Sequence, residues 1–135
     1  MELKTLNNKP RKYKKVKKYL IDWDGKSRSK IQLRVKKFLK KYWDQNVVFE
    51  EFPVIGTRLT LDFYNANKKV AVEVQGRQHV KYIKFFHKSR IDYINQLKRD
   101  EQKEKFCELN DIVLVNIYEN DIIDEHLFEI HGVTL

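Results

Sequence analysis

The chain has 135 residues, the size of one domain, with 28 Lys and Arg against 19 Asp and Glu. Its net charge of +9 favours a polyanionic partner, either nucleic acid or an anionic membrane surface. No apolar run approaches the ~20 residues of a spanning helix. The start, Met-Glu-Leu-Lys-Thr, lacks an apolar signal region, so we expect an intracellular, cytoplasmic protein. The single cysteine, Cys107, excludes an internal disulfide and a cysteine-built zinc site.

The positive charge is concentrated at the N-terminus, where residues 1–41 hold sixteen Lys and Arg but three Asp and Glu. We interpret residues 1–26 as a basic arm and residues 27–135 as the folded domain. The arm is either a mobile, solvated tail or, as we favour, a DNA contact whose tyrosines stack on bases. The cations expected to bind phosphates there are Lys9, Arg11, Lys12, Lys14, Lys15, Lys17 and Lys18.

The first long helix is predicted to begin at Ser27-Arg28-Ser29-Lys30, where either serine can cap it. Apolar residues at helical spacing follow and form one face. Val47 to Phe52 is predicted as a strand that ends at Pro53. Gly56 then suits a turn with positive φ.

Two apolar, β-branched and aromatic segments, Arg58 to Tyr64 and Lys69 to Gln75, flank Asn65-Ala66-Asn67-Lys68. This pattern predicts a β-hairpin with an Asn-rich turn.

Pairing Tyr64 with Lys69 would place Asp62 opposite Ala71 and diagonal to Glu73, within reach of its side chain. Two carboxylates that converge on an apolar hairpin repel each other unless a cation lies between them. The hairpin is therefore predicted to form half of a divalent-metal site.

A segment with interleaved aromatic residues and cations, Val80 to Lys88, follows the hairpin and is either a second DNA contact or a lid packed on the core. The cations near it that we expect to contact DNA are Arg77, Lys81 and Lys84. A second long helix is predicted from about Ser89 to Leu109. Asp100 lies on its apolar stripe, so Arg99 or Lys103 neutralises it or it faces the site.

The apolar run from Ile112 to Tyr118 is predicted to be a central, buried strand, and the tail from Asn120 is predicted to contain a short helix.

Several of these residues occur in one ordered string: Asp62, Glu73-x-Gln75, Gly76-x-Gln78-His79 and Asp100. The string resembles the core of the PD-(D/E)XK nuclease superfamily. The branch it resembles contains very-short-patch repair endonucleases, homing endonucleases with a Glu-Asp-x-His-Asp site and small phage-encoded nucleases. The similarity covers roughly Ser27 to Asn120. It implies an α/β, restriction-endonuclease-like fold, in which helices flank a mixed central sheet of four or more strands.

The resemblance also implies an activity, the Mg²⁺- or Mn²⁺-dependent hydrolysis of double-stranded DNA by a monomer or homodimer. Asp62, Glu73 and the Val74 carbonyl would hold the metal ion. His79 would act as general base or orient the attacking water. Asp100 would hold His79 or bind the ion indirectly.

Two positions depart from the pattern of these families. Gln75 stands where the superfamily usually has lysine, so His79 or Lys98 would have to substitute for that cation. Gln32 stands where these families have a glutamate on the first helix, and it is either a site residue or an exposed surface residue. Both departures leave open a second hypothesis, a DNA-binding protein whose nuclease site has decayed.

Overall fold

The computed structural model describes residues 1–75 and 90–135, and within them a four-stranded sheet has the order β3-β4-β5-β6. Its strands are β3 (Val48–Pro53), β4 (Thr60–Asn65), β5 (Val70–Gln75) and β6 (Val113–Tyr118). The first three are antiparallel, and β6 pairs with β5 in parallel. The chain is therefore an α/β protein with a mixed sheet, as predicted.

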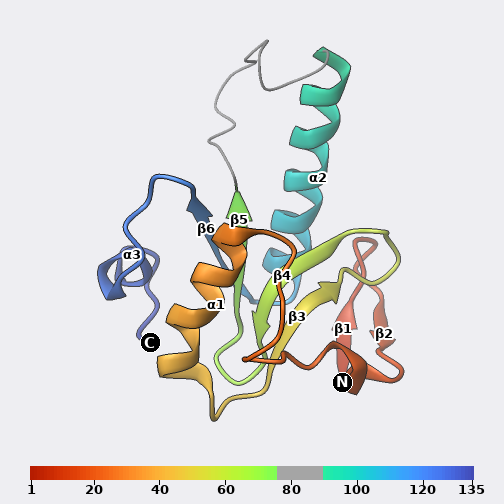
Figure 1. Cartoon of the computed structure of the whole chain (residues 1–135). Coiled ribbons are helices and arrows are strands. Elements are labelled where there is room, and N and C mark those ends of the chain that lie inside the picture. The colour runs from red at the N-terminus through yellow and green to blue at the C-terminus, as the bar shows by residue number, and fades with distance from the viewer. Residues whose placement is uncertain (76–89) are drawn as a thin grey trace.

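Helices cover both faces of the sheet (Figure 1). The helix α1 (Lys30–Trp43) lies on one face with the short α3 (Glu125–Glu129), and α2 (Arg90–Leu109) packs on the other. The predicted serine cap is confirmed, because the hydroxyl of Ser29 accepts a hydrogen bond from the Gln32 N–H at 3.2 Å.

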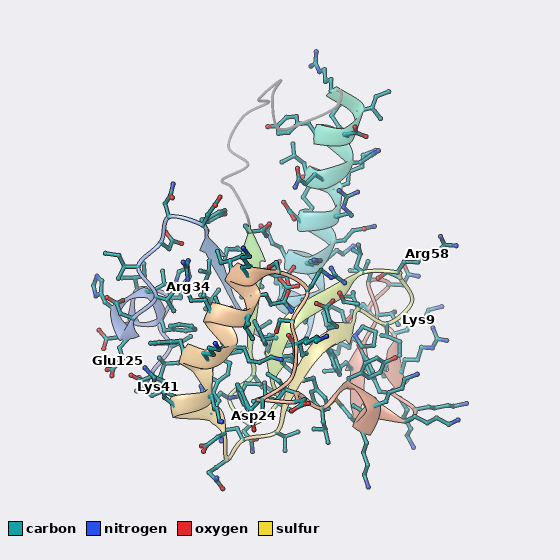
Figure 2. All side chains as sticks on the ribbon, in the orientation of Figure 1. Lys9, Asp24, Arg34, Lys41, Arg58 and Glu125 are labelled. Atoms are coloured by element: carbon teal, nitrogen blue, oxygen red, sulfur yellow. The ribbon has the colours of Figure 1, made fainter. Side chains whose placement is uncertain are left out.

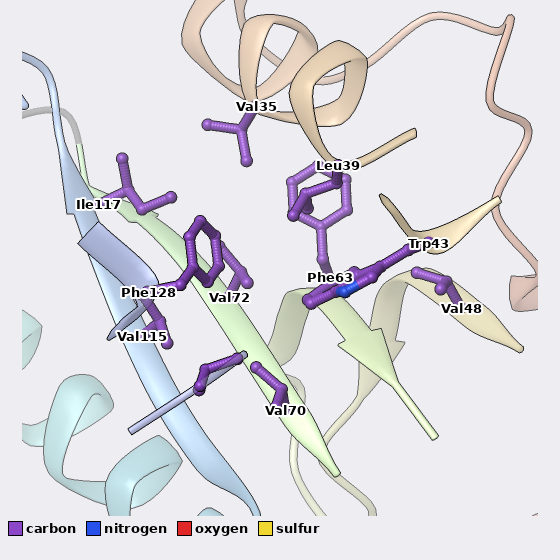
Figure 3. Close-up of a cluster of buried hydrophobic side chains, with 11 residues drawn as sticks. Val35, Leu39, Trp43, Val48, Phe63, Val70, Val72, Val115, Ile117 and Phe128 are labelled. Atoms are coloured by element: carbon purple, nitrogen blue, oxygen red, sulfur yellow. The ribbon is translucent and has the colours of Figure 1, made fainter. Parts of the chain in front are cut away.

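One hydrophobic core lies between α1, α3 and the sheet (Figure 3). It joins Val35, Leu39 and Trp43 of α1 to Phe63 and Val72 of the sheet, and all five are fully buried. Next to Phe63 and Val72, the side chains of Tyr64 and Ala71 point to the opposite face and enter the second core. There they meet Phe106 and Cys107 of α2.

The N-terminal segment is folded onto this second core. It forms a hairpin of β1 (Glu2–Lys4) and β2 (Pro10–Lys12), followed by the 3₁₀ helix η1 (Val16–Tyr19). Tyr13 is only 8% exposed and stacks on Phe52 with a ring-centroid separation of 4.7 Å. The expectation of an arm outside the core, with its tyrosines free to stack on bases, is therefore wrong for Tyr13. Sequence reasoning missed this hairpin because its strands have three residues each.

Two further details differ from the sequence predictions. Within the described residues, β6 is at the edge of the sheet and not at its centre, and Val113 is 40% exposed. In the predicted hairpin, Tyr64 pairs with Ala71 and not with Lys69. The reason is that β4 continues to Asn65, whose side-chain oxygen accepts the Lys68 N–H at 3.0 Å and closes the turn. A two-residue shift preserves the alternation of side chains, so Phe63 and Tyr64 keep opposite faces, whereas Leu61 lies in the same core as Tyr64 and not with Phe63.

Candidate functional site

Three acidic residues lie in one row across the antiparallel strands: Glu51 of β3, Asp62 of β4 and Glu73 of β5. The ladder pairs on either side of Glu51 and Asp62 set them opposite each other, and the β4–β5 register, extended by one residue beyond the Phe63–Val72 pair, sets Glu73 opposite Asp62. On the far side of Glu73 the row continues to Asn116 of β6. The corrected register thus brings Asp62 and Glu73 closer than the predicted diagonal.

Backbone hydrogen bonds hold the carboxylates of Asp62 and Glu73. The Asp62 N–H donates to Glu73 Oε2 at 2.7 Å, and the Val74 N–H donates to Asp62 Oδ2 at 2.7 Å. Both residues are buried, Asp62 at 8% and Glu73 at 2% exposure. Backbone donors therefore fix both carboxylates where little water reaches them.

This arrangement perturbs the protonation of Asp62. The pKa of Asp62 is raised from 3.8 to about 8, chiefly by burial and next by the nearby charge of Glu73, while the Val74 N–H and Lys103 oppose the shift. The two carboxyl groups therefore carry more negative potential than their protein partners neutralise. A cation placed between them would relieve it.

Among the described residues, Lys103 of α2 supplies a cation to this pair. Its ammonium forms an ion pair with Glu73 Oε1, and its side chain is 19% exposed. Lys98, which the sequence offered as a substitute for the missing lysine, is exposed on the same helix. The structure thus places a lysine at the carboxylates, although not from the position next to Glu73 in the sequence.

A small hollow of about 50 Å³ opens beside Glu73, where the parallel strands β5 and β6 end against α2. It brings the predicted site residues Glu73, Gln75 and Asp100 together. The side-chain amide of Gln75 donates to Asn116 Oδ1 at 3.2 Å. The other residues that line the hollow are Lys103, Glu104, Leu114, Asn116 and Tyr118.

Gln32 is buried, at 2% exposure, so the alternative of an exposed surface glutamine is wrong. Its side-chain N–H groups donate to Glu50 Oε2 at 2.9 Å and Glu51 Oε1 at 3.0 Å. Glu51 also binds Arg28 Nη2 at 2.6 Å and has a φ of 55°, which breaks the regular alternation of β3. Gln32 therefore holds the glutamates of β3 at one end of the acidic row.

Lys36 completes this network and was missed by sequence reasoning. It is fully buried on α1, 2.8 Å from Glu50 Oε1, and its ammonium also donates to the backbone oxygens of Asp22 at 3.0 Å and Lys26 at 3.1 Å. Its position four residues after Gln32, on the buried side of the helix, was the available signal.

The residues at the centre of the row fit a hard divalent cation. Carboxylate and carbonyl oxygens from Asp62, Glu73 and Val74 are ligands that Mg²⁺ prefers, and Mg²⁺ commonly uses one or two carboxylates together with water and phosphate oxygens. In the described ranges, no cluster of three or more His, Cys, Asp or Glu side chains has a metal-binding arrangement. The ligand set expected from the sequence, Asp62, Glu73 and the Val74 carbonyl, remains a prediction.

Four predicted residues lie outside the described residues, and their roles remain predictions. They are Arg77, His79, Lys81 and Lys84, all between positions 76 and 89. The segment from Val80 to Lys88, predicted as a second DNA contact or a lid, lies outside them as well.

Comparison with known proteins finds viral relatives. The chain is 35% identical over 65 residues to uncharacterized protein 033L of Invertebrate iridescent virus 3, and 39% identical over 59 residues to uncharacterized protein 307L of Invertebrate iridescent virus 6. It is 41% identical over 66 residues to uncharacterized protein 094L of Frog virus 3 (isolate Goorha).

These matches cover 44–48% of this chain and 34%, 30% and 43% of the respective relatives, so the matched region is less than half of each viral protein. No family model matches the chain, and no solved structure matches it. In the described part of the chain, no helix has the length and apolar composition needed to cross a bilayer.

Proposed function

We propose that this protein is a DNA endonuclease dependent on Mg²⁺ or Mn²⁺, with the restriction-endonuclease-like fold of the PD-(D/E)XK superfamily. The observation that supports it most is the pair of buried carboxylates, Asp62 and Glu73, held in adjacent strands by the backbone N–H groups of Val74 and Asp62. Structural carboxylates are seldom buried in contact with each other, because each raises the pKa of the other. Functional sites are where such a cost is commonly found.

In this proposal Asp62, Glu73 and the Val74 carbonyl hold the ion. A bound ion would supply an activated water and screen charge on the scissile phosphate. The backbone N–H groups of Asp62 and Val74 keep the two carboxylates in position.

Lys103 provides the positive charge that Gln75 cannot provide. Its ammonium has three donors, and Glu73 accepts from it through Oε1. A phosphate oxygen in the adjoining hollow can use another donor. Gln75, fixed by Asn116, contributes a polar wall to the same hollow. His79 as general base and Asp100 as its partner remain predictions from the sequence.

The second candidate is a DNA-binding protein whose nuclease site has decayed. The amides at Gln32 and Gln75 favour it, since neither can carry the charge of the residue that the resembled families have there. The ion pair between Lys103 and Glu73 weighs against it, because it restores a lysine to the carboxylates.

Cleavage of supercoiled plasmid in Mg²⁺, Mn²⁺ or EDTA tests the proposal. The protein should nick or linearise DNA with either metal and should do nothing in EDTA. Asp62→Asn should abolish cleavage, whereas Glu101→Gln, the same replacement of a carboxyl group by an amide at an exposed position of α2, should retain it. Cleavage by Asp62→Asn at the wild-type rate would refute the assignment of the site, and inactivity of the wild type with both metals would favour the decayed nuclease.

A further inference from the structure

A groove of about 590 Å³ lies between the N-terminal hairpin, the turn at Ile55–Thr57 and α2. We propose that this hairpin groove binds the phosphate backbone of duplex DNA. The inference rests on the proposed function only for the choice of DNA as the polyanion. The residues that line the groove are Thr5, Leu6, Asn7, Lys9, Pro10, Arg11, Ile55, Gly56, Thr57 and Gln102, and none is acidic.

The charge of the hairpin groove matches a phosphodiester chain. Lys9 and Arg11 are exposed cations on its hairpin wall. Within residues 1–75 and 90–135, neither forms an ion pair with a carboxylate, so both remain available to an incoming anion. Arg58 follows the opposite wall, and Figure 2 shows it on the same side of the molecule as Lys9. Two cations within the groove and a third beside it suit successive phosphates.

The groove walls are held together by Tyr13. Its hydroxyl donates to the Pro53 carbonyl at 2.6 Å and accepts the Ile55 N–H at 3.2 Å, so the segment after β2 is fixed to the chain that forms the opposite wall. Gly56, with a φ of 85°, makes the tight turn of that wall. The cations are therefore arranged before a ligand binds, which lowers the entropy cost of binding.

The form of the surface favours nucleic acid over an anionic membrane. A bilayer surface is met by a flat or convex face with protruding apolar side chains, whereas this surface is concave and its exposed side chains are mainly cationic and polar.

The groove is also next to the candidate site. Gln102 lines the groove, and its neighbour Lys103 lines the hollow beside Glu73.

Fluorescence anisotropy with a labelled DNA duplex in EDTA tests this inference without cleavage. The double variant Lys9→Gln/Arg11→Gln should bind more weakly. Its plot of log K against log[salt] should become shallower, with a slope smaller in magnitude by about 1.8, or about 0.9 for each lost phosphate contact. The matched control, Lys37→Gln/Lys41→Gln, removes the same charge from exposed positions of α1 and should keep the wild-type slope. An equal change of the salt slope in both double variants would overturn the proposal that the groove binds DNA.

Tyr13→Phe provides a second readout because it keeps every cation and removes the hydroxyl that joins the walls. It should weaken duplex binding while the salt slope stays at its wild-type value, and circular dichroism should show a folded protein. Unchanged affinity would contradict the role of Tyr13 as a positioning residue.

Two further probes separate the possible ligands. Anionic vesicles that bind in place of DNA, with the same dependence on Lys9 and Arg11, would overturn the proposal in favour of a membrane surface. An RNA duplex that binds as well as DNA would support recognition of phosphates without regard to the sugar. If DNA binding depends on the groove but no metal-dependent cleavage occurs, the proposed nuclease activity is refuted and the proposed DNA-binding groove is still supported.

Discussion

Asp62 is the residue whose protonation couples the candidate site to stability. Its pKa is raised from 3.8 to about 8 by burial and then by Glu73, so the native state keeps a proton that the unfolded chain has released. Raising the pH from 3.8 towards about 8 therefore favours the unfolded state. In EDTA, the contribution of Asp62 to the free energy of unfolding should be full below pH 3.8 and should be lost as the pH approaches about 8.

Urea titrations of the wild type and Asp62→Asn across this window measure the effect. The side-chain oxygen of the introduced asparagine can still accept the Val74 N–H, so the difference between the two proteins reports the titration and not a lost contact. We expect the stability of the wild type to fall relative to the variant as the pH rises. Parallel pH profiles would show that Asp62 has an ordinary pKa.

Lys103 is the second residue on which the site depends. Replacing it with Met leaves the charge of Glu73 buried without its ammonium partner. Breaking a buried pair costs about 3–5 kcal/mol, and we expect about 1–3 kcal/mol because the Lys103 side chain is 19% exposed. Lys105→Met, at an exposed position two residues later on α2, is the control and should change little. Equal stabilities of the two variants in urea would mean that the ion pair contributes nothing measurable.

The sequence predicts some of these residues better than others. Asp62 and Glu73 could be predicted to converge, because alternation along two strands joined by a short turn fixes their face even when the register is wrong by two residues. Lys103 could not be assigned to Glu73 in the same way. A helical stripe shows which side of α2 is buried, but not which strand it meets, so the sequence indicates Lys103 only as a partner of Asp100.

At the scale of elements, the β1–β2 hairpin is the least predictable part of the fold. Its short strands are rich in charge, and their stability comes from distant contacts that no local pattern reveals. Asn110, just after α2, accepts the Lys4 N–H at 2.7 Å and donates to the Lys4 carbonyl at 3.0 Å. Long-range hydrogen bonds of this kind attach the hairpin to the core, although its sequence alone is typical of a basic tail.

Asn110→Ala tests that attachment. It removes both bonds to Lys4 and leaves partly buried backbone groups unsatisfied, so we expect a loss of about 1–3 kcal/mol in the free energy of unfolding. Hydrogen exchange at the Lys4 amide should accelerate more than exchange in β4. Asn95→Ala, at an exposed position of α2, is the matched control and should alter neither. Normal protection of Lys4 in Asn110→Ala would show that the hairpin is held by its apolar contacts alone.

The layered arrangement explains why the molecule can keep two carboxylates buried. The antiparallel strands β3 to β5 are covered by α1 on one face and by α2 with the hairpin on the other (Figure 1). The fold class was predictable from alternating strands and amphipathic helices, but the place of β6 was not. A continuous apolar run is typical of a central strand, yet β6 is at the edge, and burial of Val115 and Ile117 explains much of its apolar character.

The whole molecule should respond to a divalent ion even if it never cleaves DNA. An ion that binds only the native state raises the free energy of unfolding by about 2.7 kcal/mol at one hundred times its dissociation constant. Mg²⁺ should therefore raise the Tm of the wild type and of Glu101→Gln, but not that of Asp62→Asn or Glu73→Gln. The shift should grow towards higher pH, since binding displaces the proton that Asp62 holds. Na⁺ at matched ionic strength controls for screening. An equal shift with Na⁺, or an undiminished Mg²⁺ response in Asp62→Asn, would place any bound cation away from the acidic row.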